Sequence, residues 1–437
     1  MTGDRTPATP AIPASLAGPA SFGGGEAAAT AAPRLLLLVP ARTYRAADFL
    51  LAAGRMGLDL VVGSDGALPL GGRPVIPVSQ ADAAASADRI IARSGPVAAV
   101  VAADTPMLGL AAVVAARMGL PHNPVQAVLA TADKASQRRL WADSAVAQPA
   151  FAVVPAPACD DAVRRGAEAV GFPCVVKAVS LSASQGVLRA DDPAAAVSAA
   201  GRIRHILAAA RRPAGEPLLI EEYLPGPELS IDGLLTDGGL TVTAIFDKPR
   251  TPDGPTFEET LLITSSRLAG PVLAAAVRTA GRAARALGLT HGPVHAELRV
   301  SDSGEPAMLE LAARCIGGLC GRALRFPGGA SLEELVLANA LGRVIPAGYQ
   351  PVRPSGVFML PVPRPGVLRA VEGRTEAAAV PGITGLTVTI PIGQHVRPLP
   401  EGDRYLGFIF AEGDTHGDVG QALAAAQERL HVVIRPR

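Results

Sequence analysis

Between residues 34 and 119, apolar and polar positions alternate in a regular strand–helix pattern. Continuous apolar runs, typical of strands buried on both faces, occupy 34–40, 58–66 and 96–104, and apolar residues at helical spacing occupy 43–57, 81–95 and 107–119. Strands and helices that follow one another in this order place their strands in parallel. The pattern therefore predicts a small doubly wound α/β domain with a parallel sheet.

After residue 125 the pattern becomes more varied. Helical spacing covers 131–144, 160–171, 192–210, 270–288 and 332–341, and strand patterns cover 150–154, 173–179 and 217–224. Residues 229–248 read as a hairpin that turns at 237–239. From about residue 346 the chain is rich in Pro, Gly and Val with β-type alternation, and it ends in a helix and a strand. We interpret this last part as a small α+β domain.

Residues 294–314 predict a second hairpin, whose polar face carries two glutamates. If its strands are symmetric about a turn at 303–304, Glu297 lies directly opposite Glu310. Like charges in that position repel, so we expect a cation between them, and Mg²⁺ prefers carboxylate oxygens. The alternative is two exposed glutamates on the wet face of a sheet. Arg299 and Arg314 on the same face favour the cation site over that alternative.

Composition narrows the class of protein. The 437 residues are enough for two or three domains, and 49% are apolar, so a large core can form. Net charge is +1 and no basic run is interleaved with aromatics, which argues against nucleic-acid binding. No apolar run approaches the ~20 residues of a membrane span. The Ala-, Pro- and Gly-rich residues 1–33 predict a disordered tail.

The four cysteines follow no disulfide or zinc spacing. Cys315 and Cys320 could bind a metal, but buried thiols in a reducing compartment are the simpler reading. We therefore expect a cytoplasmic protein that does not act at a membrane.

Three further segments offer groups for a nucleotide. Lys177 is the single charge in an apolar strand, so its ammonium must reach a partner or extend to the sheet edge. The loop 180–187 has small and hydroxyl side chains and one glycine, and its amides could close over phosphates. The strand end 221–224 could hydrogen-bond an adenine, with Glu228 near the ribose. An ordinary polar strand end is the alternative.

The order of these motifs resembles the ATP-grasp ligases. The resemblance rests on Lys134 in "ADKASQRRLWADSAVAQP", Lys177 in "PCVVK", and the segments "EEYLPGPELS", "HAELR" and "MLELAARCIGG". Within that superfamily, the chain is most similar to L-amino-acid ligases that make dipeptides, from about residue 34 to the C-terminus. This resemblance implies an N-terminal α/β domain at 34–125, an ATP-grasp domain of two α+β subdomains at 126–345, and a C-terminal α+β cap at 346–437.

The resemblance also implies roles for individual residues. ATP would be bound by Lys134, Lys177, Ser184, Gln185, Gly186, Glu221, Tyr223, Leu224 and Glu228. Glu297 and Glu310 would bind Mg²⁺ or Mn²⁺, and Arg314 and Lys177 would be catalytic. The residues that border the substrates would be Lys248, Glu258, Glu259, His295, Arg314, Gly317 and Gly318.

The implied reaction joins a carboxylate and an amine, both amino acids, into an amide through an acyl phosphate, with release of ADP and phosphate. A homodimer is common in this family. The alternatives are another ATP-grasp reaction, such as carboxylation of a purine precursor, and a nucleotide-binding protein without catalysis. Two features depart from the family pattern. Ala312 stands where many members carry Asn at the metal site, and the loop 180–187 has fewer glycines than usual.

Overall fold

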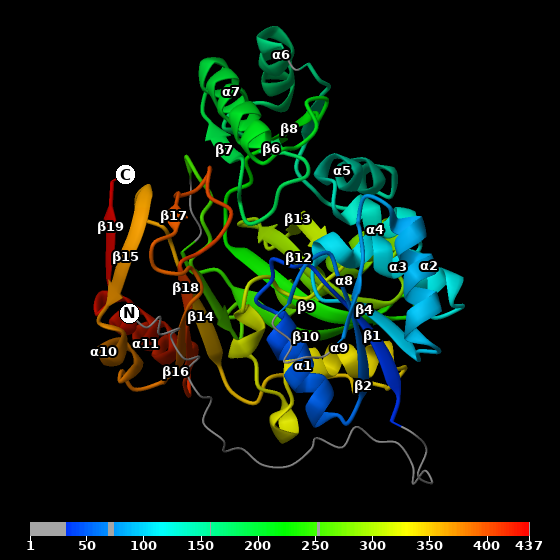
Figure 1. Cartoon of the computed structure of the whole chain (residues 1–437). Coiled ribbons are helices and arrows are strands. Elements are labelled where there is room, and N and C mark those ends of the chain that lie inside the picture. Colours follow the sequence, from blue (N-terminus) through cyan, green and yellow to red (C-terminus); the bar gives the residue numbers. More distant parts are fainter. Residues whose placement is uncertain (1–31, 69–73, 158, 251–253, 437) are drawn as a thin grey trace, which may run out of the picture.

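The computed structural model describes residues 32–68, 74–157, 159–250 and 254–436. Their strands form an N-terminal parallel sheet, a small and a large antiparallel sheet, and a three-stranded sheet near the C-terminus. Figure 1 shows the small sheet with its two helices standing apart from the other layers. Most of the predicted tail, residues 1–31, lies outside the described residues.

The N-terminal sheet has the predicted parallel architecture. Its strand order is β3-β2-β1-β4, with β1 (Arg34–Val39), β2 (Asp59–Ser64), β3 (Val75–Pro77) and β4 (Ala99–Ala102). Its helices are α1 (Ala46–Arg55), α2 (Ala83–Ser94) and α3 (Leu108–Arg117), and a short 3₁₀ turn, η1 (Thr105–Met107), precedes α3. On β1, Leu36 and Leu38 pack with α2 and α3, whereas Leu35 and Leu37 pack with α1 and α9 (Leu332–Ala340). Burial on both faces explains the continuous apolar run.

The small sheet has the antiparallel order β5-β8-β6-β7. Its elements are β5 (Phe151–Val154), α6 (Asp160–Val170), β6 (Cys174–Ala178), β7 (Val187–Ala190), α7 (Pro193–Ala209) and β8 (Leu218–Glu222). Helices α6 and α7 cover one face, and α7 starts at Asp192, whose side chain accepts a hydrogen bond from the Ala195 N–H. The other face lies toward α5 (Lys134–Asp143), which follows α4 (Val125–Thr131).

The large sheet has eight strands in the order β13-β12-β9-β10-β11-β14-β18-β16. These are β9 (Glu228–Thr236), β10 (Gly239–Asp247), β11 (Leu261–Thr264), β12 (Gly292–Val300), β13 (Pro306–Ala312), β14 (Ser355–Leu360), β16 (Ile383–Val388) and β18 (Gly407–Glu412). Helix α8 (Gly270–Ala286) packs on one face of β9 and β12, and α11 (His416–Glu428) packs on β11, β14 and β18. The first predicted hairpin forms as expected, because Asp237 and Gly238 both take the positive φ that a tight two-residue turn requires.

The second hairpin has the predicted pairing at the glutamates and a different pairing near its turn. Glu297 lies directly opposite Glu310, but the next pair is Leu298 with Met308, so Leu309 is an extra residue on β13. Such a bulge bends the strand and shifts the register by one toward the turn. The assumption of a symmetric turn at 303–304 was therefore wrong for the outer half of the hairpin, which is nearest the turn. It was right for the inner half, which includes the pair Glu297 and Glu310.

The C-terminal part continues the large sheet across the predicted domain boundary near residue 346, because β14 pairs with both β11 and β18. The three-stranded sheet is formed by β15 (Gly366–Glu372), β17 (His395–Val396) and β19 (His431–Arg435). The remaining elements are α10 (Arg374–Ala378) and two 3₁₀ turns, η2 (Cys320–Ala323) and η3 (Pro327–Gly329). The predicted boundaries stay predictions. No helix in the described ranges is long and apolar enough to cross a membrane.

Candidate active site

The candidate site lies on one face of the large sheet, where β9, β12 and β13 present charged side chains and Lys248 follows the end of β10. On β9, Glu228 and Asp232 lie beside Arg299 and His295 of β12, and Glu297 pairs with Ser230. Because side chains of one strand alternate between faces, these residues share the face opposite to α8. A row of charged residues on a buried face needs mutual compensation, and the structure provides it.

Lys248 lies at the centre of the largest charged cluster. Its side chain is 5% exposed, and its Nζ donates to Glu228 Oε1 at 2.7 Å and to Glu259 Oε1, and lies 3.3 Å from Glu297 Oε1. The three carboxylates offer oxygens within 4.8 Å of one another. Although burial opposes its charge, these carboxylates raise the pKa of Lys248 well above its ordinary value. The structure thus brings together four of the residues predicted from sequence.

The carboxylates around Lys248 are not equivalent. Burial and the charge of Glu297 raise the pKa of Glu259 to about 7, against the attraction of Lys248. Burial alone would also raise the pKa of Glu297, but Lys248 and His295 hold it well below its ordinary value. Glu297 also has His295 and Glu228 also has Arg299, so Glu259 has the weakest compensation and keeps its proton to higher pH. Glu258, next in the chain, is half-buried, and burial raises its pKa as well.

His295 connects this cluster to a buried aspartate. Its Nδ1 lies 3.1 Å from Asp232 Oδ2, and its Nε2 lies 3.2 Å from Glu297 Oε1. Burial lowers the pKa of the imidazole, but the two carboxylates outweigh it and raise the pKa to about 9. Asp232 Oδ1 also accepts the Ile316 N–H at 2.7 Å. Asp232 therefore links β12, through His295, to the loop that follows β13, through Ile316.

Glu310 has a different cation from Glu297. Lys134 Nζ lies 3.2 Å from Glu310 Oε2 and donates to Leu181 O at 2.6 Å. The sequence predicted a positive charge between the two glutamates; in the structure each glutamate has its own lysine, from a different element. Because Lys134 also reaches the loop at 180–187, it links that loop to the large sheet.

The small sheet contributes a second charged group. Glu221 on β8 is buried between Arg138 Nε at 2.6 Å and Lys177 Nζ at 2.5 Å. Burial would raise the pKa of Glu221, but these two cations lower it to about 2. Lys177 thus has the partner that its place in an apolar strand requires. Arg138 also donates to the carbonyls of Met308 and Leu309, so it joins both sheets.

The chain segment after β8 is held by an arginine of β12. Arg299 donates to Leu224 O at 2.5 Å and to Glu228 Oε2 at 3.1 Å. The guanidiniums of Arg189 and Arg299 lie 4.6 and 5.1 Å from the Tyr223 ring centroid. The Leu224 carbonyl, which lies in the segment where adenine contacts were predicted, therefore already accepts one hydrogen bond from the large sheet.

The loop at 180–187 closes back on β6 and carries a strained backbone. Ala183 and Ser184 have φ values of 55° and 57°, a region that non-glycine residues seldom occupy, and Gly186 has a φ of 64°, which glycine adopts readily. The Ala178 N–H donates to Gly186 O, and the Gln185 N–H donates to Ser182 O. Strained loop backbones cluster at ligand-binding sites.

Arg314 lies at the junction with the N-terminal domain. Its Nε donates to Thr105 Oγ1 at 3.0 Å and lies 3.9 Å from Asp104 Oδ1, at the carboxyl end of β4. Ligands of open parallel sheets bind at that end of the strands. Gly317 packs against the Arg314 guanidinium, and Gly318 has a φ of 62° with the Phe408 ring behind it.

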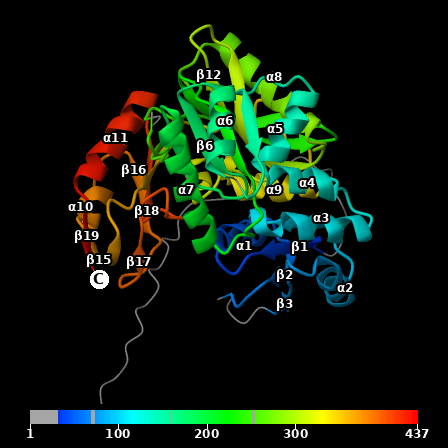
Figure 2. The same cartoon turned by 90° about the horizontal axis from the view of Figure 1, so that it is seen from above.

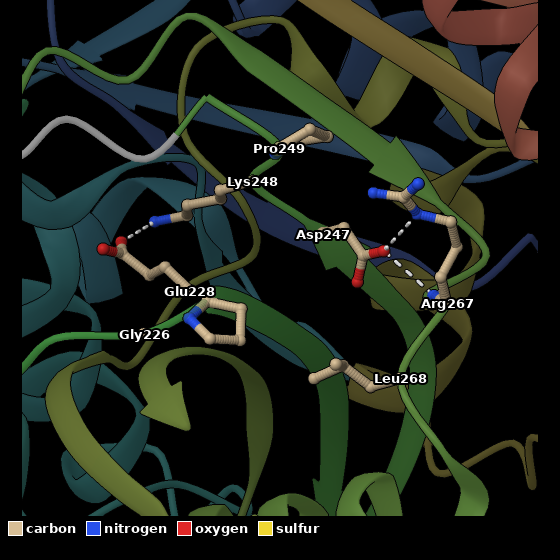
Figure 3. Close-up of a pocket in the computed structure, with 8 residues that line it drawn as sticks. Gly226, Glu228, Asp247, Lys248, Pro249, Arg267 and Leu268 are labelled. Atoms are coloured by element: carbon tan, nitrogen blue, oxygen red, sulfur yellow. Dashed lines mark hydrogen bonds and ion pairs between the residues drawn. The ribbon is translucent and has the colours of Figure 1, made fainter. Parts of the chain in front are cut away.

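A pocket of about 520 Å³ borders this site at the ends of β9 and β10 (Figure 3). Its lining includes Glu228 and Lys248 on one side and Asp247, Arg267 and Leu268 on the other. Asp247 accepts the Arg267 N–H at 2.9 Å and the Ser266 hydroxyl. The pocket is therefore an extension of the charged cluster toward solvent.

Sequence reasoning missed Arg138, Asp232 and Thr105. Arg138 lies in the helix that carries Lys134, four residues later and hence on the same helix face, which was the available signal. Asp232 lies four residues after Glu228 on β9 and hence on the same face of the strand, so it could have been inferred from the alternation of faces. Thr105 had no signal, because only the tertiary structure brings the N-terminal domain to Arg314.

The fold and these sites define a class of protein. A family model for the ATP-grasp domain matches residues 170–323, and one for the L-amino acid ligase C-terminal domain 2 matches residues 358–435. The chain therefore contains an ATP-grasp domain followed by an L-amino acid ligase C-terminal domain. An L-amino acid ligase from Bacillus licheniformis has the same fold, with a TM-score of 0.76 at 23% identity over 93% of this chain and 100% of that one.

Curated relatives match over shorter lengths. The D-alanine–D-alanine ligase of Gloeobacter violaceus is 33% identical over 202 residues, 44% of this chain and 63% of that protein. Carnosine synthase 1 of Gallus gallus is 33% identical over 221 residues, 47% of this chain and 24% of that protein. The chain thus spans less than two thirds of the length of either relative. The predicted family and fold class are confirmed: a parallel N-terminal sheet precedes an ATP-grasp fold with antiparallel sheets.

Proposed function

We propose that this chain is an ATP-dependent ligase that joins two amino acids through an acyl phosphate and releases ADP and phosphate. The observation that carries the proposal is the direct opposition of Glu297 and Glu310 on the large sheet, with Lys134 beside Glu310 and Lys177 on the facing small sheet. The match to the L-amino acid ligase C-terminal domain supports amino acids as substrates over a purine precursor.

The donor set fits a hard divalent cation. Glu297 and Glu310 offer carboxylate oxygens, which Mg²⁺ and Mn²⁺ prefer, and phosphate oxygens and water would complete the coordination. When bound, the ion would neutralise charge on the transferred phosphoryl group. Lys248 and Lys134 hold the two glutamates in place by ion pairs. Ala312 leaves the set without the amide that many ATP-grasp proteins have there.

The chain's own residues supply position and charge. Lys134 and Lys177 would bind phosphate oxygens, and Glu228 would accept the ribose hydroxyls beside Arg299. Arg314 would stabilise the negative oxygens of the acyl phosphate and of the tetrahedral intermediate that forms when the amine attacks. Little covalent chemistry falls to the protein in phosphoryl transfer, so most of the rate would come from orientation and electrostatics.

The test is a screen of amino-acid pairs with Mg²⁺ and ATP, in which ADP, phosphate and the amide product are measured together. We expect ADP and phosphate to form in equal amounts with the amide and only when a carboxylate substrate is present. A carboxylate labelled with ¹⁸O should transfer one label to the released phosphate. AMP and pyrophosphate as products would overturn the proposal, because they indicate adenylation.

A further inference from the structure

The C-terminal domain contacts the small subdomain, which consists of the small sheet with α6 and α7, at the loop 180–187 and at α7. Residues 398–402, between β17 and β18, form a tight turn in which the Gly402 N–H donates to Pro398 O at 2.8 Å. A side chain on Gly402 would meet Arg397 O at 2.2 Å, so the turn needs a glycine there. Figure 2 shows α7 of the small subdomain beside this part of the C-terminal domain. The hydrogen bond and the close contact at Gly402 therefore fix the shape of this turn.

Three contacts join the turn to the small subdomain. The Gly186 N–H donates to Pro400 O at 3.2 Å, and Gln185 Nε2 donates to Glu401 O at 3.0 Å. Arg202 on α7 binds the Glu401 carboxylate through two hydrogen bonds of 2.6 and 3.0 Å. A two-pronged pair of this kind fixes orientation as well as distance. Two of the three contacts fall on the loop whose residues Ala183 and Ser184 have a strained backbone.

We propose that the turn 398–402 is a clasp through which the C-terminal domain holds the small subdomain closed over the large sheet, with Arg202–Glu401 as its charged anchor. The proposal rests on the proposed role of the loop 180–187 in binding ATP. A subdomain that is held near the large sheet before ATP arrives loses less freedom on binding, so the clasp raises ATP affinity. The anchor side chains are 49% and 35% exposed, so the effect is modest.

Exchange of backbone amides in the nucleotide-free protein tests the clasp directly. We expect Arg202→Gln and Glu401→Gln each to raise the exchange rate of the Gly186 amide by about 2- to 5-fold, the range for an exposed ion pair. The double variant with Arg202→Glu and Glu401→Arg should restore slow exchange. The Arg189 amide, which donates to Pro255 O at 3.0 Å, serves as the internal reference.

A matched control is Arg117→Gln. Arg117 is also an exposed helical arginine with a carboxylate partner, Asp88, at 2.6 Å, but it lies in the N-terminal domain. It should leave both the exchange of the loop and the affinity for ATP unchanged. Loop exchange in Arg202→Gln and Glu401→Gln no faster than in this control would overturn the clasp.

Calorimetric titration with ATP gives the functional reading. We expect the two single variants to weaken ATP binding by about 2- to 5-fold and the charge-swapped variant to recover it. Tighter ATP binding in the single variants, or a charge-swapped variant weaker than either, would overturn the clasp. If the wild type does not bind ATP, the proposed function fails, whereas the exchange data still decide whether the turn holds the loop.

Discussion

The two facing sheets of the site both carry buried carboxylates, and they compensate them in opposite ways. On the small sheet, one carboxylate, Glu221, is bound by two cations and has its pKa lowered to about 2. On the large sheet, Glu228, Glu259 and Glu297 surround Lys248. Arg299 also pairs with Glu228 and His295 with Glu297, whereas Glu259 has only its share of Lys248, and its pKa rises to about 7. An excess of cations fixes a structure, whereas an excess of carboxylates leaves room for a further cation. We call Glu221 with Arg138 and Lys177 the small-sheet pin, because these ion pairs fix the structure, whereas the carboxylates around Lys248 form a candidate cation-binding site.

The largest effect should follow the loss of the small-sheet pin. Glu221→Gln leaves Arg138 and Lys177 buried without their counter-charge, and breaking such a pair costs about 3–5 kcal/mol. We expect a loss of unfolding free energy of that size in urea titrations. The neighbouring Glu222→Gln is the control, because Glu222 is exposed and should change stability by less than about 0.5 kcal/mol. Equal losses in both variants would contradict the comparison.

The next effect should be on rate rather than on stability. Glu310→Gln keeps the side-chain shape but removes one of the two opposed charges, and we expect turnover to fall by about 10²- to 10³-fold. Stability without nucleotide should fall by about 1 kcal/mol at most, because Lys134 loses its ion pair with Glu310 while the repulsion between Glu297 and Glu310 is relieved. Steady-state kinetics and a melting curve measure the two quantities. Glu305→Gln, in the turn of the same hairpin, should behave as wild type, and wild-type turnover in Glu310→Gln would end the metal-site hypothesis.

Opposite pH dependences should distinguish the two sheets. Glu259 ionises near 4.5 when unfolded and near 7 when folded, so between these values only the folded state keeps the proton. Stability from this group therefore falls as pH rises from about 4.5 to 7, by about 1–3 kcal/mol. Glu221 has the opposite sign, since its stability contribution falls as pH drops from 4.5 to 2.

Urea titrations across pH, without Mg²⁺ or ATP, measure this dependence. In Glu259→Gln the decline between pH 4.5 and 7 should become clearly smaller, with a remainder from Glu258, whose pKa burial also raises, while the loss below pH 4.5 remains. An unchanged decline in this variant would show that another group causes it.

The smallest effect should come from an exposed carboxylate of the small subdomain. Asp192→Ala removes the N-cap of α7, where the side chain accepts the Ala195 N–H at 2.8 Å, and should cost about 1 kcal/mol in unfolding free energy. Asp191→Ala is the control and should lie within about 0.5 kcal/mol of wild type. A cost for Asp192→Ala as large as that for Glu221→Gln would mean that burial is not what distinguishes the pin.

Local pattern was enough to predict the elements that carry the site. Alternation on 294–300 and 306–312 placed Glu297 opposite Glu310, because strand faces repeat every two residues and the inner half of the hairpin is regular. The outer half failed, since a bulge at Leu309 has no signature in the alternation of polar and apolar residues. The strand at 187–190 was also missed, because its sequence Val-Leu-Arg-Ala shows neither a strict alternation nor a continuous apolar run.

What the sequence by itself determined was the parallel N-terminal domain, the helix start at Asp192, and the demand that Lys177 find a buried partner. Only the tertiary structure decided which partners meet: Glu221 with Arg138, Glu310 with Lys134, and the turn at 398–402 with Arg202. The physical reason is that periodicity and capping act over a few residues, whereas these ion pairs join positions 83, 176 and 199 residues apart in the chain. Charge compensation in a buried site depends on distance in space, and only the packed sheets set that distance.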